Sequence, residues 1–340
     1  MQRLRWTLGL VGGLMGCRVA PVSPVPAPAT AEVAPTAAPT AAPTAAPVED
    51  PRRPAVLERL ARIGIIGASQ AAGFGTGVGF ADTLDVVLQV PHQIHDSSVA
   101  LMHLGAQQIG GLQITAVKLR RVSTVFAVDF LFWFAYGDKP LAQRRADLRE
   151  GMAMLESLGV PVFVGDLPDV HGASRRMIGR HVIPPASELR VLNAELYAWA
   201  QQRPDMILLP LAGWMNAIRM ETPVELEGRH VTLRTGEGLQ WDLLHPTVLG
   251  QALLTLLVID HLRAAWGGLL PGDVRHRPAV VADLATPSRE PAPEGALPVP
   301  PSTAPSTVSS TAPSTAPSTA PSTAPSTAPS TVGSARTEPG

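Results

Sequence analysis

Three residues of this chain have the types and the spacing needed for nucleophilic catalysis. Ser69 follows the short apolar run Ile63-Gly64-Ile65-Ile66-Gly67-Ala68, and Asp242 stands three residues before His245. At that spacing a carboxylate can accept a hydrogen bond from one imidazole nitrogen while the other nitrogen faces a serine hydroxyl. We therefore predict Ser69 as a nucleophile, His245 as its general base and acid, and Asp242 as the residue that orients the histidine.

Each half of this pattern has an ordinary structural explanation when it is taken alone. A serine after a strand more often caps a helix, and an Asp followed by a His near a helix start is common on protein surfaces. Glycines at 73, 75, 77 and 79 follow the serine, so the backbone after it can turn sharply and approach a ligand closely. The serine after the first strand and the Asp-x-x-His would occur together by chance much more rarely than either would occur alone.

The elements that would have to position these residues alternate along the chain. Apolar and β-branched runs predict strands, and 3.6-residue periodicity predicts helices. The predicted strands are 61–68, 123–132, 160–165 and 205–211; the predicted helices are 141–158, 187–202 with Ser187 as the N-cap, and 247–265. Such alternation indicates a parallel sheet covered by helices on both faces, with ligands bound beyond the carboxyl ends of the strands.

The segment 80–121 is the least regular part of this pattern. Residues 81–90 and 111–121 have helical patterns. A strand within 98–104 would complete a five-stranded sheet, so we expect a three-layer α/β/α sandwich.

The order of a Gly-x-Ser after the first strand and an Asp-x-x-His-Pro near the end of the domain resembles the SGNH, or GDSL-like, hydrolase family. The runs 161–169, 192–195 and 205–211 are similar to that family's fourth strand with its loop and to its next helix and strand, so the resemblance spans about 61–265. It implies a flavodoxin-like parallel sheet and a serine esterase that needs no cofactor and no metal. The implied roles are nucleophile for Ser69, general base for His245 and orienting acid for Asp242.

Three departures from the family pattern concern the residues around the nucleophile. The usual Asp before the serine is Ala68. The glycine that donates a backbone N–H to the oxyanion hole is best matched by Gly105, with the glycines at 110 and 111 as alternates. The Gly-x-Asn-Asp that supplies a side-chain donor is missing, and the chain has Asp129 and Trp133 there instead. An ionised Asp129 would repel an oxyanion, whereas the Trp133 indole N–H could donate to one; loss of one such donor costs about 100-fold to 1000-fold in turnover.

Other motifs in the chain fit their functions less well. The set His92, His95 and Asp96 could hold a metal, but a loop with two histidines is the commoner explanation. The glycine run contains neither a dinucleotide fingerprint nor a P-loop. The residues after Ser69 lack the second glycine of the Gly-x-Ser-x-Gly elbow, which argues against a standard α/β-hydrolase.

Composition indicates one globular domain between two low-complexity ends. The chain has 340 residues with 27 Lys+Arg and 28 Asp+Glu, and this balance gives no support to nucleic-acid binding. Proline and Ala/Thr/Ser repeats gather at both ends, so we expect a linker at 18–54, a hydrolase-like domain at 55–268 and a disordered tail at 269–340.

The first seventeen residues predict export. A basic start and a short apolar run are typical of a signal peptide, and Leu14-Met15-Gly16-Cys17 resembles a bacterial lipobox. That resemblance implies lipidation of Cys17 and a lipid anchor in the cell envelope; an ordinary signal peptide with an incidental cysteine is the alternative. Arg18 stands where an inner-membrane retention Asp often lies, which favours the outer membrane or cell surface.

Together these features predict an exported, lipid-anchored serine esterase. Its expected substrates are small-molecule or glycan esters, including carbohydrate O-acetyl groups. The alternative is a non-catalytic envelope protein that keeps the fold to bind a glycan or a partner while its oxyanion hole has decayed.

Overall fold

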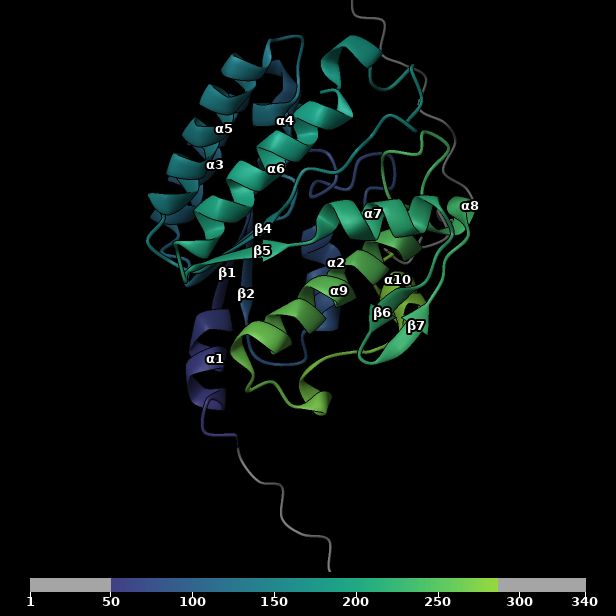
Figure 1. The fold of residues 1–340 in the computed structure, drawn as a ribbon. Coiled ribbons are helices and arrows are strands. Elements are labelled where there is room, and N and C mark those ends of the chain that lie inside the picture. Colours follow the sequence, from purple (N-terminus) through teal and green to yellow (C-terminus); the bar gives the residue numbers. More distant parts are fainter. Residues whose placement is uncertain (1–49, 287–340) are drawn as a thin grey trace, which may run out of the picture. The chain divides into compact units, whose positions relative to one another are not determined.

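The computed structural model describes residues 50–286, and these contain a five-stranded parallel sheet (Figure 1). The strands lie in the order β2-β1-β3-β4-β5 and all pair in parallel. Their bounds are β1 Arg62–Ile65, β2 Gln93–Asp96, β3 Thr124–Ala127, β4 Val162–Gly165 and β5 Met206–Leu209. This is the flavodoxin-like order, and it reverses direction between β1 and β3, where such sheets bind their ligands.

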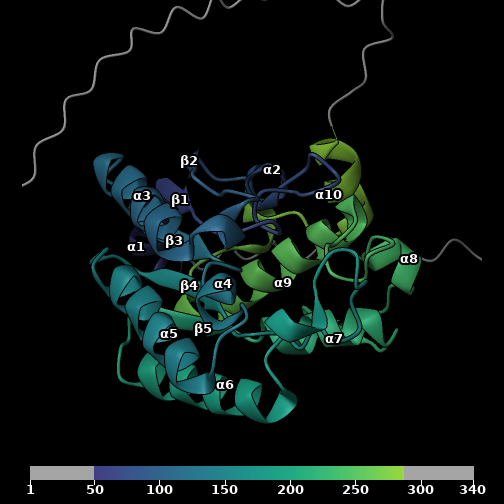
Figure 2. The ribbon, with the colours of Figure 1, turned by 90° about the horizontal axis from the view of Figure 1, so that it is seen from above.

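Helices cover both faces of the sheet, as Figure 2 shows from above. One face carries α3 Ala106–Leu119, α4 Phe132–Ala135, α5 Leu141–Glu156 and α6 Ala186–Gln201. The other carries α1 Arg53–Leu60, α2 Phe80–Val87, α7 Leu211–Arg219, α9 Val248–Trp266 and α10 Pro278–Ala285, and the small elements α8 Thr235–Gly238, β6 Val224–Leu226 and β7 Arg229–Val231 lie near α7 and α9. Each face therefore has its own hydrophobic core, which confirms the predicted three-layer sandwich.

The central strands form where every side chain is apolar or small. All four residues of β3 and of β4 are buried, as expected for strands covered on both faces. The predicted strand 123–132 is too long, because β3 ends at Ala127 and the chain turns into the short helix α4.

The strand predicted within 98–104 is wrong: the fifth strand is β2, at Gln93–Asp96, and Met102–Leu104 forms a 3-10 turn. β2 is an edge strand whose four residues are mostly polar and partly exposed, so it lacks the apolar run that marks the other strands. The apolar residues that suggested a strand further on, Val99 and Leu101, are 37% and 53% exposed.

The boundaries of several helices differ from the sequence pattern. α6 begins at Ala186 after Pro185, and Ser187 is therefore inside the helix and is not its cap. α3 begins at Ala106, five residues before the predicted start at 111. The predicted helix over 81–90 corresponds to α2, which ends at Val87.

The packed part of the chain extends beyond residue 268, the expected end of the domain. The helix α10 packs against α9 and α2, and its Val281 is fully buried. The connection to it is also fixed, since Gln89 N–H donates to Asp273 O at 2.8 Å and Arg275 N–H to Val87 O at 2.9 Å. The expected boundary at 268 is therefore too early, because a short apolar helix beside a proline-rich tail is not distinct in composition.

Among the described residues, α9 is the one helix long and apolar enough to cross a membrane. It packs instead on the sheet, α2 and α10, and most of its side chains are buried there. The predicted signal peptide at 1–17, the linker up to 49 and the repeats from 287 onward lie outside the described residues.

Candidate active site

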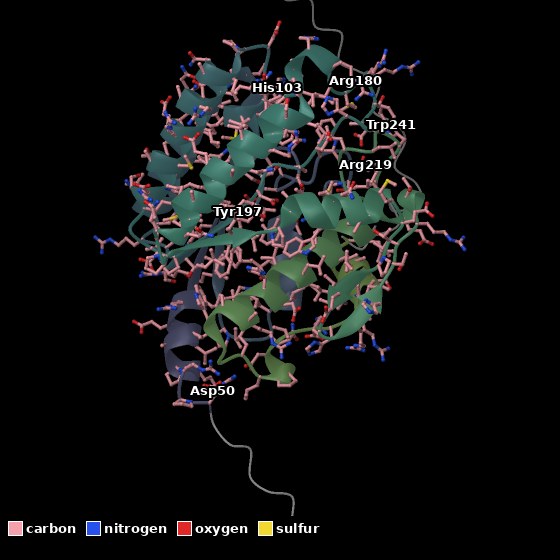
Figure 3. The ribbon with its side chains drawn as sticks, in the orientation of Figure 1. Asp50, His103, Arg180, Tyr197, Arg219 and Trp241 are labelled. Carbon is pink, nitrogen blue, oxygen red and sulfur yellow. The ribbon has the colours of Figure 1, made fainter. Side chains whose placement is uncertain are left out.

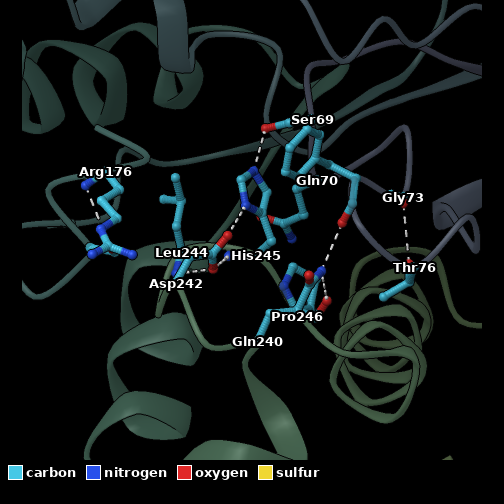
Figure 4. A network of polar contacts seen from close by, with 12 residues as sticks. Ser69, Gln70, Gly73, Thr76, Arg176, Gln240, Asp242, Leu244, His245 and Pro246 are labelled. Carbon is cyan, nitrogen blue, oxygen red and sulfur yellow. Dashed lines mark hydrogen bonds and ion pairs between the residues drawn. The ribbon is translucent and has the colours of Figure 1, made fainter. Parts of the chain in front are cut away.

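The structure brings Ser69, His245 and Asp242 together in one hydrogen-bonded chain (Figure 4). Ser69 Oγ lies 2.9 Å from His245 Nε2 although the two residues are 176 positions apart, and His245 Nδ1 lies 2.7 Å from Asp242 Oδ2. Asp242 and His245 are both buried, at 1% and 4% exposure. This is the geometry in which a histidine can take a proton from a serine while a carboxylate holds its tautomer.

Ser69 lies on the turn that follows β1, at the point where the sheet order reverses. Two residues before it, Gly67 has φ +155°, and a Cβ at that position would lie 2.3 Å from Asp129 Oδ1. Only glycine fits this conformation and this space. The glycine of the Gly-x-Ser pattern therefore allows the turn that carries Ser69, residues 67–71, to lie directly on the end of β3. We call these residues the nucleophile turn, after the role predicted for Ser69.

Asp129 holds the nucleophile turn in place by accepting hydrogen bonds from its backbone. Its Oδ1 accepts the Ala68 N–H at 2.8 Å, and its Oδ2 accepts the N–H groups of Gln70 at 2.8 Å and of Ala71 at 3.4 Å. Burial raises the pKa of this carboxyl, and the three backbone donors act in the opposite direction. Both carboxylate oxygens are thus engaged with the backbone around Ser69, a role that the sequence did not reveal.

The loop that carries Asp242 and His245 is held in a tight turn. Asp242 Oδ1 accepts the N–H groups of Leu244 and His245, both at 3.0 Å, and Leu243 between them has φ +56°. Burial alone would raise the pKa of Asp242, but the hydrogen bonds from the His245 ring and from these two backbone groups outweigh it and lower the pKa below its usual 3.8. The carboxylate therefore stays ionised beside the histidine.

A second contact joins the glycine-rich loop, residues 73–79, to the histidine loop. Gln240 Nε2 donates to Phe74 O at 2.7 Å and to Pro246 O at 2.9 Å (Figure 4). The Phe74 ring packs on the His245 ring with centroids 4.6 Å apart. Phe74 thus contacts the imidazole directly, and Gln240 joins the two loops that carry these rings; neither residue stood out in the sequence.

The two predicted oxyanion donors, Trp133 and Gly105, differ in their position relative to the cavity beside Ser69. Trp133 lines the same cavity as Ser69, and its buried indole N–H has no hydrogen-bond partner among the described residues. Gly105 does not line that cavity, and its N–H already donates to Met102 O. The alternates Gly110 and Gly111 lie inside α3. Gly105 is therefore wrong as a donor, because the segment after β2 forms a 3-10 turn that uses its amide.

One further backbone group is available at the site. Ala68, Gln70 and Ala71 all donate to Asp129, whereas the Ser69 N–H has no acceptor among the described residues. The nucleophile's own N–H and the Trp133 indole are thus two unpaired donors beside one cavity, as an oxyanion hole requires.

The cavity beside Ser69, which we call the catalytic cavity, has a volume of about 190 Å³ and is mainly apolar. Its two carboxyl groups, Asp129 and Asp166, accept hydrogen bonds from protein donors. The apolar wall consists of Leu101, Val128, Phe132, Trp133, Val170, Met177, Leu211, Met215 and Leu244. The arrangement suits an apolar group attached to a carbonyl that Ser69 attacks.

The histidines considered as metal ligands serve structural contacts. His92 bonds through its two ring nitrogens to Val90 O and to Asp85, and His95 lies in β2. Within residues 50–286 no group of three or more His, Cys, Asp or Glu side chains is arranged to hold a metal ion.

The sheet order, with Ser69 after β1 and with Asp242 and His245 before α9, is that of an SGNH-like, or GDSL-like, hydrolase fold. No protein-family model and no curated protein matches the chain. Solved structures with similar folds include TesA, at 16% identity and a TM-score of 0.37, covering 60% of this chain and 99% of that one. A GDSL-like lipase from Bacteroides thetaiotaomicron has 13% identity and a TM-score of 0.39, covering 62% of this chain and 91% of that one. LAE5, an α/β hydrolase enzyme from the metagenome of Lake Arreo, has 13% identity and a TM-score of 0.39, covering 62% of this chain and 96% of that one. At this distance the likenesses say nothing of what this chain acts on.

Proposed function

We propose that this chain is a serine esterase that hydrolyses carboxylic esters through an acyl-enzyme on Ser69. The single observation that carries the proposal is the hydrogen bond of 2.9 Å between Ser69 Oγ and His245 Nε2 at the edge of the catalytic cavity. His245 takes the serine proton as Oγ attacks the ester carbonyl and returns it to the leaving alcohol. Water then attacks the acyl-enzyme with His245 again as the base, which releases the acid.

The oxyanion of each tetrahedral intermediate would be stabilised by the Ser69 N–H and the Trp133 indole N–H. Both are unpaired among the described residues, and the indole is buried, where an unmade hydrogen bond is costly. An oxyanion that accepts both bonds removes that cost only when it forms, so the donors favour the transition state.

We also propose, from the sequence alone, that the enzyme is exported and anchored by lipid on Cys17 in the bacterial cell envelope. Its substrates would then be small-molecule or glycan esters of that compartment. The alternative of a non-catalytic binding protein requires a decayed site, whereas Ser69, His245 and Asp242 lie at hydrogen-bonding distances.

The test is covalent labelling by a fluorophosphonate together with hydrolysis of p-nitrophenyl butanoate. We expect the wild type to label and to turn over, and Ser69→Ala and His245→Ala to lose at least about 1000-fold in kcat. Ser97→Ala, which removes a hydroxyl just beyond β2, is the matched control and should keep full activity. A wild type that neither labels nor hydrolyses faster than Ser69→Ala would overturn the proposal.

A further inference from the structure

A basic segment lies beside the proposed active site. Residues 170–185, which we call the arginine loop, contain Arg175, Arg176 and Arg180 with two histidines and no acidic residue. All three arginines are exposed. The chain as a whole is nearly neutral, with 27 basic and 28 acidic residues, so this concentration of positive charge is local.

The three arginines have no acidic partner among the described residues. Arginines elsewhere in the fold pair with carboxylates, as Arg144 does with Glu188, Arg145 and Arg149 with Glu195, and Arg203 with Glu156. No ion pair of this kind involves any arginine of the arginine loop within residues 50–286. Unpaired guanidinium groups beside a cavity raise the local concentration of anions and bind carboxylate or phosphate oxygens through two N–H groups.

Backbone hydrogen bonds join the arginine loop to Asp242 near one end and to a residue just beyond α4 near the other end. Ser174 N–H donates to Asp242 O at 2.8 Å, next to Arg175. Near the other end, Gly137 N–H donates to Val182 O at 2.9 Å, just beyond α4, the helix that carries Trp133. Figure 4 shows Arg176 near the Asp242–His245 turn, and Figure 3 shows Arg180 at the same end of the molecule as His103.

A second, larger cavity lies between the arginine loop and α4. Its volume is about 430 Å³, and His103, Trp133 and Met177 line both it and the catalytic cavity. The two spaces therefore adjoin at the indole. Lys139 and His181 add basic groups to the second cavity, and its one acidic residue, Asp147, is paired with Lys139 at 2.5 Å.

The two cavities differ in what they can hold. The catalytic cavity is mainly apolar and small, so it suits the acyl group, while the second cavity is more polar and is lined by residues 177–179, 181 and 182 of the arginine loop, next in sequence to Arg176 and Arg180. An ester whose carbonyl lies at Ser69 and whose acyl group fills the catalytic cavity would direct its alcohol part past Trp133 into the second cavity.

From this arrangement we infer that the alcohol part of the substrate carries a negative charge, a carboxylate or a phosphate, which the arginine loop recognises. The inference rests on the proposed function for the position of the ester. Recognition would appear mainly in KM, because the charge lies away from the reacting atoms and binds equally in the ground state and the transition state.

The test compares 4-carboxyphenyl butanoate with its uncharged analogue, 4-carbamoylphenyl butanoate, and adds 4-(phosphonooxy)phenyl butanoate to separate carboxylate from phosphate. We expect the wild type to show a KM for at least one anionic ester roughly fivefold below that for the amide. In Arg175→Gln/Arg176→Gln, and to a smaller degree in Arg180→Gln, this preference should largely disappear. It should also shrink at about 1 M salt, where the Debye length is only about 3 Å.

The matched control is Arg120→Gln/Arg121→Gln, which removes two exposed arginines between α3 and β3, at the opposite end of the strands. It should keep the wild-type preference. Equal KM values for anionic and neutral esters in the wild type, or a preference that survives in Arg175→Gln/Arg176→Gln, would overturn the inference.

A binding measurement separates this inference from the proposed function. Titration calorimetry of Ser69→Ala with the products 4-hydroxybenzoate, 4-hydroxyphenyl phosphate and 4-hydroxybenzamide needs no turnover. Tighter binding of an anion without hydrolysis by the wild type would support the inference and contradict the esterase. Fluorophosphonate labelling without charge selectivity would do the reverse.

Discussion

At the scale of single residues, the most informative side chain is Asp129, which stands where the pattern of the SGNH-like family that the sequence resembles has an asparagine donor. Instead of facing the oxyanion as a repelling charge, its two oxygens accept backbone N–H groups from both sides of Ser69. Because these bonds occupy the N–H groups of the neighbouring residues, the Ser69 N–H is the one in this turn without an acceptor among the described residues. The residue acts through the backbone and is a positioning residue.

We therefore expect Asp129→Asn to slow fluorophosphonate labelling at least tenfold, because an amide offers one acceptor and turns its own N–H₂ toward the backbone donors. The readout is the rate of labelling at saturating reagent and not the stability of the variant, because removing the buried charge of Asp129 offsets part of the stability lost with its hydrogen bonds. Asp273→Asn is the control, because Asp273 is equally buried and accepts the Leu270 N–H at 2.7 Å outside the catalytic cavity. Labelling of Asp129→Asn at the wild-type rate would refute this role.

A prediction for Asp242 concerns pH. Its pKa is lowered in the folded protein, so below neutral pH the unfolded state binds more protons and stability falls as pH falls. The stabilisation is fully present above about pH 5 and is lost as the pH falls through the unfolded pKa of about 4 toward the lowered folded value. Urea unfolding of the wild type and of Asp242→Asn should thus differ most at pH 7 and converge toward pH 3.

Asp138→Asn is the control for that titration, because it removes an exposed carboxylate that has no ion pair within residues 50–286. Its stability should follow the wild-type curve. A constant gap between the wild type and Asp242→Asn across this range would show that the carboxylate is not the stabilising group.

At the scale of elements, the site depends on loops that follow β1, β3 and β4 and on the turn before α9. The glycine loop, residues 73–79, is joined to that turn by Gln240, which bonds to Phe74 O and Pro246 O. His245, the proposed general base, is thus positioned by two loops that are far apart in the sequence, and we expect substitution within the glycine loop to affect it.

Gly75 and Gly77 offer a matched pair for testing this link. Both have positive φ, +80° and +70°, so an alanine at either pays a similar conformational cost of about 1 kcal/mol. A Cβ on Gly75 would lie 2.3 Å from Gln240 Oε1, whereas a Cβ on Gly77 meets nothing within 4 Å. We expect Gly75→Ala to lower kcat/KM roughly tenfold more than Gly77→Ala, and equal losses would contradict the link.

At the scale of the whole molecule, the sheet brings residues from four of its strand ends and from α7 around one cavity. Its volume of about 190 Å³ slightly exceeds the roughly 150 Å³ of an engineered cavity that binds benzene. An acetyl group would leave most of this apolar space empty. If Ser69 is acylated as proposed, this volume favours acyl groups of roughly four to six carbons.

We expect kcat/KM for p-nitrophenyl esters to rise about fourfold per methylene from acetate to butanoate or hexanoate, and then to fall. Met215→Phe, which fills the cavity wall, should move the optimum to shorter chains. Met220→Phe, an exposed methionine just beyond the same helix α7, is the control and should leave it unchanged. A series that is fastest with acetate would contradict this assignment of the cavity.

The sequence by itself determined the layered α/β fold and the three residues of the proposed triad. Buried central strands such as β3 and β4 are continuous apolar runs, and an Asp three residues before a His defines a local geometry, so both are visible in a short window. The edge strand β2, the helix α10 and the unsuitability of Gly105 were not visible, because a polar edge strand and a single apolar helix have weak local patterns.

Only the tertiary structure decided how Ser69 is supported. The hydrogen bonds that Asp129 accepts, the link through Gln240 and the place of Trp133 beside Ser69 all join segments separated by tens to more than a hundred positions. Such contacts depend on where the strand ends meet, which no local pattern encodes. For the same reason, only the tertiary structure brings the two adjoining cavities together with the arginine loop, part of which lines the second cavity.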